Sequence, residues 1–306
     1  MAATGTAEQT EYLERLTDAG LLIPSGVPGV YGRGRDFEEV RLAFDAYLSR
    51  QREPGVELMS FPPLLPREHL EAAGYMKSFP HLAGTIFAFE GDERSALALQ
   101  ERVVEGADWS EFQRMSDVAL VPAACFPVYP AIASRGPLPA GGAVVDPGDA
   151  WVFRHEPSAD PSRLMSFHQR EFVRLGEAEA VEAWRDAWRD RGLELLRDLG
   201  LDARYDLGAD PFFGRGGKML VSSQREQRLK FEILIEIAGP DPVAVASFNY
   251  HQTHFAETFG ILTAAGETAH TACLGFGHER VTLGLFKRHG LDIGDWPTEV
   301  RQLLWQ

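Results

Sequence analysis

The stretch from Thr271 to Phe286 constrains the fold of this chain more than any other segment. Gly275 and Gly277 interrupt a short apolar run, Glu279 and Arg280 follow, and regularly spaced apolar residues continue to the end of the stretch. The pattern predicts a strand, a glycine turn and a helix with one buried face. Glycines there let a planar ligand approach the backbone, and the arginine supplies a fixed fork of donors for phosphate oxygens.

The composition fits a globular protein, and we expect residues 1–306 to form a single domain. The chain is 44% hydrophobic and 25% charged, without a Pro/Gly/Ser linker or an internal repeat. Its start lacks a basic region followed by an apolar core, so we expect a cytoplasmic protein with no membrane contact. The net charge of -15 argues against broad contact with nucleic acid, so tRNA is not an expected partner.

Apolar periodicity predicts a mixed series of helices and strands. Helices are expected in the first 24 residues and at 36–51, 93–105 and 177–199. Strands are expected at 56–63, 84–91, 118–121, 151–156, 163–173, 230–237 and 243–250, and a loop at 210–218.

Two predicted strands joined by a short polar turn carry a second group of functional candidates. The first strand ends with Arg154 and Glu156, and the second contains Arg163, Phe167 and Glu171. Successive residues of a strand point to opposite faces, so even spacing places each group on one face. We therefore expect these side chains to line one side of a β-hairpin.

The two cysteines, Cys125 and Cys273, do not form a disulfide framework and are either inert thiols or metal ligands. Both lie near the predicted hairpin and the glycine-containing strand, as Glu171 does. Two thiolates, one carboxylate and an open fourth position suit a catalytic zinc ion. Spacing alone leaves two unrelated buried cysteines as the default interpretation.

The helix predicted at 177–199 carries Arg185, Arg189 and Arg191. This run is either a solvated charged face or a docking surface for an acidic partner.

Taken together, these segments resemble the class II aminoacyl-tRNA synthetases. Residues 271–286 resemble motif 3, 151–171 resemble motif 2, and 36–63 resemble motif 1, which builds the dimer interface in that class. Residues 21–292 resemble the amino acid:[carrier protein] ligases, homologues of the methanogen-type seryl-tRNA synthetase catalytic domain without its tRNA-binding domain. The matching blocks are Pro24–Arg33, Pro122–Cys125, Phe153–Pro157, Asp210–Gly214 and Ser247–His251. The resemblance implies an α+β fold with an antiparallel sheet flanked by helices.

The resemblance also implies a reaction, with ATP, Mg²⁺, a small amino acid such as glycine or alanine and a phosphopantetheinylated acyl carrier protein as partners. The amino acid would be converted to an adenylate and then to a thioester. Arg154 would hold the α-phosphate and Glu156 the adenine amino group, and Arg280 would meet the γ-phosphate. Phe167 and Arg280 would sandwich the adenine.

The remaining implied roles concern the amino acid, the metal ions and the carrier. Archaeal methanogen-type seryl enzymes hold zinc with Cys, Glu and Cys, the last Cys seven residues before the motif 3 arginine. Cys273 and Arg280 have that spacing here. Zinc on Cys125, Glu171 and Cys273 would seat the substrate amino group. Arg163 would meet the substrate carboxylate or phosphate, Ser247 and Asn249 would line the pocket, and a helical insertion at 177–200 would dock the carrier through Arg185, Arg189 and Arg191. A homodimer is implied by motif 1.

Some positions depart from the family pattern. Ala244 stands where seryl enzymes carry a metal-binding Glu, so Mg²⁺ is assigned to Glu232 or Glu236. His168, Gln169 and His278 also differ from relatives; these differences either alter substrate choice or are surface substitutions, and we favour the second interpretation.

Two other functions stay open. The chain could charge another acceptor such as tRNA, although its short motif 2 loop, its charge and its lack of a tRNA-binding arm count against this. It could also be a catalytically silent paralogue that binds an amino acid and regulates, although the arginines and metal ligands needed for catalysis are present.

Overall fold

The computed structural model describes residues 5–214 and 217–306, and a large sheet organises them. Its strands are β3 (Glu57–Leu58), β7 (Ala143–Asp146), β8 (Asp149–Phe153), β9 (Ser166–Gly176), β10 (Arg204–Leu207), β11 (Lys230–Ile235), β12 (Val243–Gln252) and β13 (His270–Gly277). Among the described residues these eight strands have the order β10-β11-β12-β13-β9-β7-β3, and β8 also pairs with β9. Only β3 and β7 are parallel in this sheet. The predicted antiparallel α+β fold is therefore confirmed.

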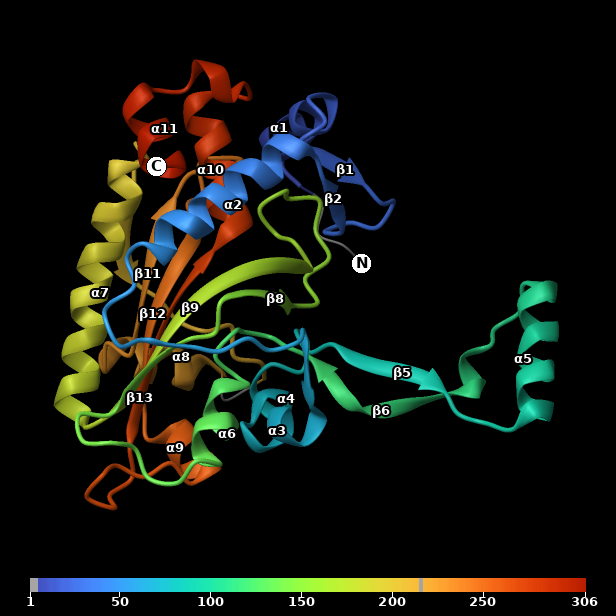
Figure 1. The fold of residues 1–306 in the computed structure, drawn as a ribbon. Helices are drawn as coiled ribbons and strands as arrows, with labels where there is room; N and C mark the ends of the chain where they lie inside the picture. The colour runs from blue at the N-terminus through green and yellow to red at the C-terminus, as the bar shows by residue number, and fades with distance from the viewer. Residues whose placement is uncertain (1–4, 215–216) are drawn as a thin grey trace.

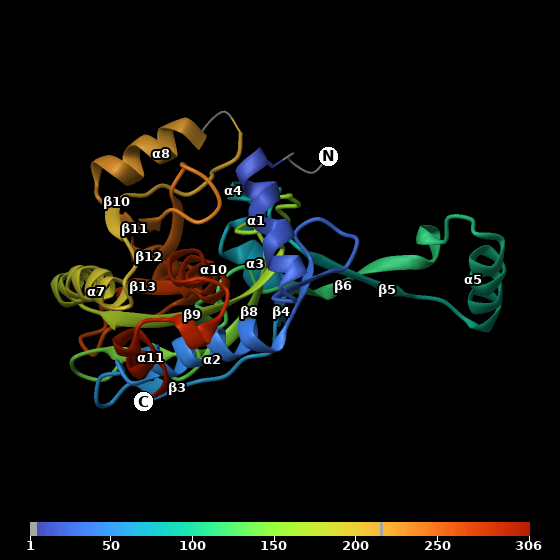
Figure 2. The ribbon, with the colours of Figure 1, turned by 90° about the horizontal axis from the view of Figure 1, so that it is seen from above.

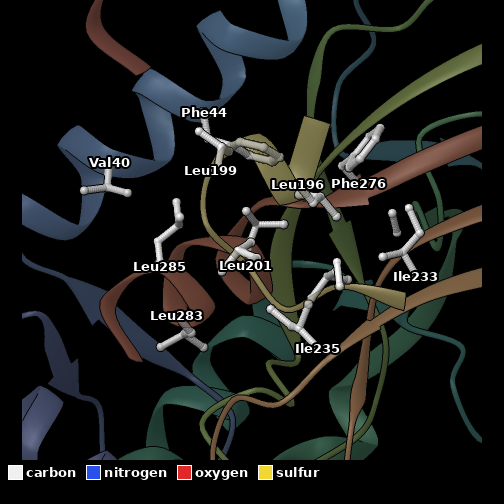
Figure 3. Close-up of a cluster of buried hydrophobic side chains, with 14 of the residues drawn as sticks. Val40, Phe44, Leu196, Leu199, Leu201, Ile233, Ile235, Phe276, Leu283 and Leu285 are labelled. Carbon is white, nitrogen blue, oxygen red and sulfur yellow. The ribbon is translucent and has the colours of Figure 1, made fainter. Parts of the chain in front are cut away.

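Helices cover both faces of this sheet (Figure 1). On one face, Phe172, Phe248 and Phe276 pack with α2 (Arg35–Ser49), α7 (Ala178–Asp198) and α10 (His278–His289) in the largest core, part of which Figure 3 shows. On the other face, Val173 and Cys273 pack against α6 (Val128–Ala133) and α9 (His254–Phe259). The alternation follows from the two-residue period of a strand. Helices α1 (Ala7–Asp18) and α11 (Thr298–Trp305) pack at the edge of the first core.

A smaller sheet carries an arm that projects from the body (Figures 1 and 2). It consists of β4 (Leu64–Pro66), β6 (Gln113–Leu120) and β5 (Thr85–Phe89), in that order, and α5 (Glu93–Glu105) lies at the tip. Each residue of α5 is at least partly exposed. The short helices α3 (Arg67–Ala72) and α4 (Tyr75–Ser78) lie at the base, and β1 (Leu22–Pro24) and β2 (Tyr31–Arg33) form a separate hairpin.

Several predicted boundaries change. The strand expected at 56–63 is reduced to β3, since Pro62 and Pro63 cannot donate ladder hydrogen bonds. The expected glycine turn is absent: Gly275 and Gly277 lie inside β13, and α10 begins directly after it. The loop expected at 210–218 ends before 218, because α8 (Gly217–Glu226) begins at Gly217. Residues 215–216 of this expected loop lie outside the described residues.

Within the described part of the chain, every helix is too short or too polar to cross a bilayer.

Candidate active site

A small cavity lies where the end of β8, the start of β9 and the start of α10 meet. It is lined by Arg154, Glu156, Ser162, Leu164, Phe167, Glu279 and Arg280. The guanidinium of Arg154 lies 5.6 Å from the centre of the Phe167 ring, and its Nε donates a hydrogen bond to the carbonyl of Pro122. Arg163 forms an ion pair with Glu156 at 3.5 Å. Five residues with predicted roles in nucleotide or substrate binding therefore lie close together: Arg154, Glu156, Arg163, Phe167 and Arg280.

Arg280 is fixed by the backbone. Its Nε donates to the carbonyl of Ser162 and its Nη1 to the carbonyl of Ala244, both at 2.8 Å. Burial and the positive charges of Arg154 and Arg163 lower the pKa of Arg280 to about 10. The guanidinium stays charged near neutral pH, and it clusters with those of Arg154 and Arg163. Such a cluster suits a polyphosphate.

The turn between β8 and β9 is held by Asp160. Its Oδ1 accepts hydrogen bonds from the backbone nitrogen and the hydroxyl of Ser162, both at 2.8 Å, and its Oδ2 accepts one from Gln9 of α1. The turn therefore packs against the body, which places the Ser162 carbonyl on Arg280. The loop between the two strands is longer than predicted, because β8 ends at Phe153 and β9 begins at Ser166. Arg163 therefore lies in this loop, before β9 begins.

Glu279 received no role from the sequence, yet it is buried in the wall of the cavity. It accepts hydrogen bonds from the backbone nitrogen of His168 at 2.8 Å and forms an ion pair with Arg33 at 2.6 Å. The His168 ring also lies 2.8 Å from it, through Nδ1. Glu279 thus connects β9, β2 and the start of α10.

The interpretation of His168, Gln169 and His278 as surface substitutions is wrong. Their relative exposures are 6%, 7% and 0%. His278 lies 3.1 Å from Asp149 and 3.6 Å from Asp45. Asp45, Asp149 and His278 lie close enough together to hold a metal ion. Arginines already neutralise the two carboxylates, because Arg41 contacts Asp149 and Arg170 contacts Asp45, each at 2.7 Å. We therefore interpret this cluster as a buried ion-pair network and not as a metal site.

Cys125, Glu171 and Cys273 converge farther along the same sheet face, four residues beyond Phe167 on β9. Their ligand atoms all lie within 4.8 Å of one another, and all three residues are buried. The Oε2 atom of Glu171 is buried with no hydrogen-bond partner. Two sulfurs and a carboxylate oxygen at this separation, with an unpaired oxygen, are the donor set of a tetrahedral zinc site with an open position. The residues therefore fit zinc.

The pKa values of the three groups in this cluster shift in different directions. Its hydrogen bond with Cys273, together with burial, raises the pKa of the Cys125 thiol. The hydrogen bond from Cys125 lowers the pKa of the Cys273 thiol despite burial, and burial raises the pKa of Glu171. A cation would favour the charged form of all three groups.

The strand register aligns the residues around the thiol cluster in two rows that run across the sheet. Glu232, Ser247, Gly275 and Glu171 are neighbours across β11, β12, β13 and β9. In the adjacent row, Lys230 lies beside Asn249 and Asn249 beside Cys273. Ser247 and Asn249 thus lie beside the cluster, and their contact with the substrate stays a prediction.

Gly275 leaves room at the centre of the first row. A Cβ there would lie 2.9 Å from Nε2 of Gln169 and 3.1 Å from Cγ of Glu171. The glycine is therefore used for close approach and not for a turn.

Lys230 and Asp210, which received no role from the sequence, form an ion-pair cluster with Glu232. The ammonium of buried Lys230 lies 2.6 Å from Asp210 and 3.0 Å from Glu232. Burial lowers the pKa of Lys230, but the two carboxylates outweigh this and raise it. Glu236, the other expected Mg²⁺ ligand, lines a different cavity, beside α1 and Lys287.

The docking role predicted for Arg185 is wrong. Arg185 is 1% exposed and donates to the carbonyl of Arg228. Arg189 pairs with Asp186 and Asp190, and Arg191 donates to Gln51. Helix α7 lies over the sheet, and its apolar face packs into the largest core. The sequence shows that these residues are charged, but it does not show how deeply each side chain is buried.

Comparison with solved structures defines the class of the fold. Methanopyrus kandleri seryl-tRNA synthetase, solved in complex with tRNASec, matches 99% of this chain at a TM-score of 0.82 and 22% identity. This chain spans 61% of that synthetase chain. The protein therefore has the catalytic fold of the class II aminoacyl-tRNA synthetases.

The family follows from curated relatives. Amino acid--[acyl-carrier-protein] ligase 2 of Bradyrhizobium diazoefficiens is 46% identical over 99% of this chain and 90% of the relative. Ligase 1 of the same organism is 44% identical over 95% of this chain and 89% of the relative. No protein-family model matches the sequence. The chain belongs to the amino acid--[acyl-carrier-protein] ligases and is a ligase.

Proposed function

We propose that this protein activates a small amino acid with ATP and transfers it to the phosphopantetheine thiol of an acyl carrier protein. One observation carries the proposal: Phe167 in the nucleotide cavity and Glu171 in the thiol cluster lie four residues apart on β9. They share a face of the strand and are separated by about 13 Å along it. A nucleotide and an amino acid bound at the two ends would meet between them.

In the first step, a carboxylate oxygen of the amino acid attacks the α-phosphorus of ATP. The bond from that phosphorus to the bridging oxygen breaks, and pyrophosphate leaves with the electron pair. Arg154 and Arg280 face this charge, so their main contributions are positioning and electrostatic stabilisation. Phe167 offers a face for the adenine and Glu156 an acceptor for its amino group.

In the second step, the carrier thiol loses its proton to solvent and its sulfur attacks the acyl carbon of the adenylate. The bond between that carbon and the AMP oxygen breaks, which gives the thioester and AMP. The relatives' names support an acyl carrier protein as acceptor. Arg163 is half exposed at the cavity mouth and would meet the substrate carboxylate or phosphate.

Zinc held by Cys125, Glu171 and Cys273 would act as a Lewis acid for the substrate amino group. All three residues are buried, in keeping with a small amino acid as substrate. Ser247 and Asn249 border this pocket. Mg²⁺ would arrive with the ATP phosphates; Glu232 lies on the same face, where Lys230 now neutralises it.

The test is amino-acid-dependent exchange of labelled pyrophosphate into ATP, screened across glycine, alanine and serine with and without a zinc chelator. Exchange with one small amino acid, lost on chelation and restored by zinc, is the expected result. Folded, zinc-loaded protein that catalyses no exchange would instead favour the silent paralogue. Transfer is then read as hydroxylamine-labile label on a phosphopantetheinylated carrier, with tRNA as the competing acceptor.

We also propose a homodimer that uses α2 and β3. Leu42 on α2 and Leu58 on β3 are 53% and 59% exposed, and β3 is an edge strand of the main sheet. Both elements lie on the same side of the molecule in Figure 2. Light scattering should give twice the chain mass, and Leu58→Glu should shift it toward the monomer because a charge would then be buried in the interface.

A further inference from the structure

His251 on β12 contacts the thiol cluster without belonging to the proposed ligand set. Its Nε2 lies 3.5 Å from Sγ of Cys273. The amide nitrogen of Asn249, two residues earlier on the same strand, donates to the same sulfur at 3.4 Å. Two nitrogen groups therefore converge on one of the two thiols.

The groups around His251 offer partners to both ring nitrogens. Its Nδ1 lies 3.2 Å from the hydroxyl of Thr271 and 3.5 Å from the hydroxyl of Tyr129. Both hydroxyls can donate a hydrogen bond to Nδ1. In the tautomer with its hydrogen on Nε2, the ring donates to the sulfur while Nδ1 accepts from these hydroxyls.

The Tyr129 ring is itself fixed, since it stacks on Phe255 with ring centres 4.1 Å apart and an interplanar angle of 8°. Thr271 is fully buried on β13, two residues before Cys273. The direction of the His251 ring is thus determined by rigid elements on both sides.

We propose that His251 is a positioning residue that donates a hydrogen bond to the Cys273 thiolate and thereby sets the strength of zinc binding. This inference rests on the zinc centre of the proposed function. Hydrogen bonds to a ligating thiolate hold its orientation and withdraw electron density from the sulfur. Partners of this kind change metal affinity about 10- to 100-fold when removed. His251 would therefore tune how strongly the metal attracts the substrate amino group.

The experiment measures zinc affinity by competition with a chromophoric chelator, and the absorption of the Co²⁺-substituted protein. His251→Ala should weaken zinc binding about 10- to 100-fold and shift the thiolate-to-cobalt charge-transfer band, while the ligand-field bands keep their tetrahedral intensity. Thr271→Val should give a smaller shift in the same direction, because Nδ1 loses one donor. His254→Ala is the matched control: His254 lies at the start of α9 and contacts the carbonyl of Ala73, so the metal should bind as in the unchanged protein.

Three results would overturn the inference, and they are distinguishable. If the unchanged protein binds no zinc, the proposed metal centre itself is wrong. If the unchanged protein binds zinc and His251→Ala matches it within twofold, only the role of His251 is wrong. If His251→Ala also loses the tetrahedral ligand-field bands, His251 is a direct ligand. Should that variant fail to fold, His251→Gln and Thr271→Val supply the same comparison.

Discussion

Both carboxylate oxygens of Glu279 lie 2.8 Å from the backbone nitrogen of His168. His168 follows Phe167, and Glu279 precedes Arg280. Because Phe167 and Arg280 line the same cavity, this contact holds the proposed adenine-binding groups at a constant separation. Arg33 adds an ion pair to the same carboxylate.

Glu279→Ala should raise the KM for ATP tenfold or more while the zinc content stays unchanged. The substitution leaves the His168 N–H and the Arg33 guanidinium buried without their acceptor, at a cost of about 1–3 kcal/mol for each group. Glu279→Gln keeps an acceptor oxygen and should be milder. Pyrophosphate exchange at varied ATP measures this, with thermal unfolding as a control; an unchanged KM for ATP would exclude the positioning role.

Tripolyphosphate should stabilise the protein against heat through the arginine cluster. A ligand at 100 times its Kd stabilises the folded state by about 2.7 kcal/mol. Arg280→Ala should remove most of the increase in Tm. Since the pKa of Arg280 is about 10, the anion effect should be present at neutral pH and weaken as pH rises through that value, where the guanidinium loses its proton. An equal Tm increase in Arg280→Ala would contradict this assignment.

Zinc binding should release protons and strengthen as pH rises. Burial raises the pKa of Glu171, and the hydrogen bond with Cys273 and burial raise that of Cys125, so both groups in the metal-free protein keep their protons to a higher pH than they would in water. The metal must displace those protons, so lower pH opposes binding. Titration calorimetry in buffers of different ionisation enthalpy measures the proton count. Cys125→Ser should lose both zinc and exchange activity, and binding independent of pH would argue against these ligands.

Gly275→Ala should reduce zinc affinity and amino acid activation. Its Cβ would press on Gln169 and Glu171, and overpacking of this kind costs about 1–3 kcal/mol. Gly277→Ala is the matched comparison on the same strand: its Cβ would meet only the carbonyl of Val245 at 3.8 Å, so its Tm and zinc content should stay close to those of the unchanged protein. Equal zinc affinity in both variants would show that the space at Gly275 is not needed.

Removing the tip of the arm should spare adenylation. Phe89 pairs with Gln113, so a two-residue Asn-Gly turn can replace residues 91–111 between the two strands. The removed segment includes α5, which contributes nothing to either cavity wall or to the thiol cluster. Pyrophosphate exchange should keep its rate within about twofold. A large loss would mean that the arm supports the site from a distance.

The sequence by itself determined the elements around the site. The glycines and the Glu-Arg pair after them predicted a strand followed by a helix, and β13 and α10 are found there. Helix α5 has the predicted bounds 93–105. Even spacing placed Phe167 and Glu171 on one face, because a strand's two-residue period is local. The resemblance added the grouping of Cys125 with Glu171 and Cys273, which spacing alone left open.

Only the tertiary structure decided which groups are buried and which meet. Arg185 and His278 are polar residues in amphipathic segments, and composition predicts such residues at the surface, yet both are buried by neighbouring elements. The contacts of Glu279 with His168 and of His251 with Cys273 join different strands and helices. Such contacts depend on strand register and on the depth of each side chain in the fold. Local sequence patterns describe neighbours along the chain, whereas register and depth come from packing between segments far apart in it.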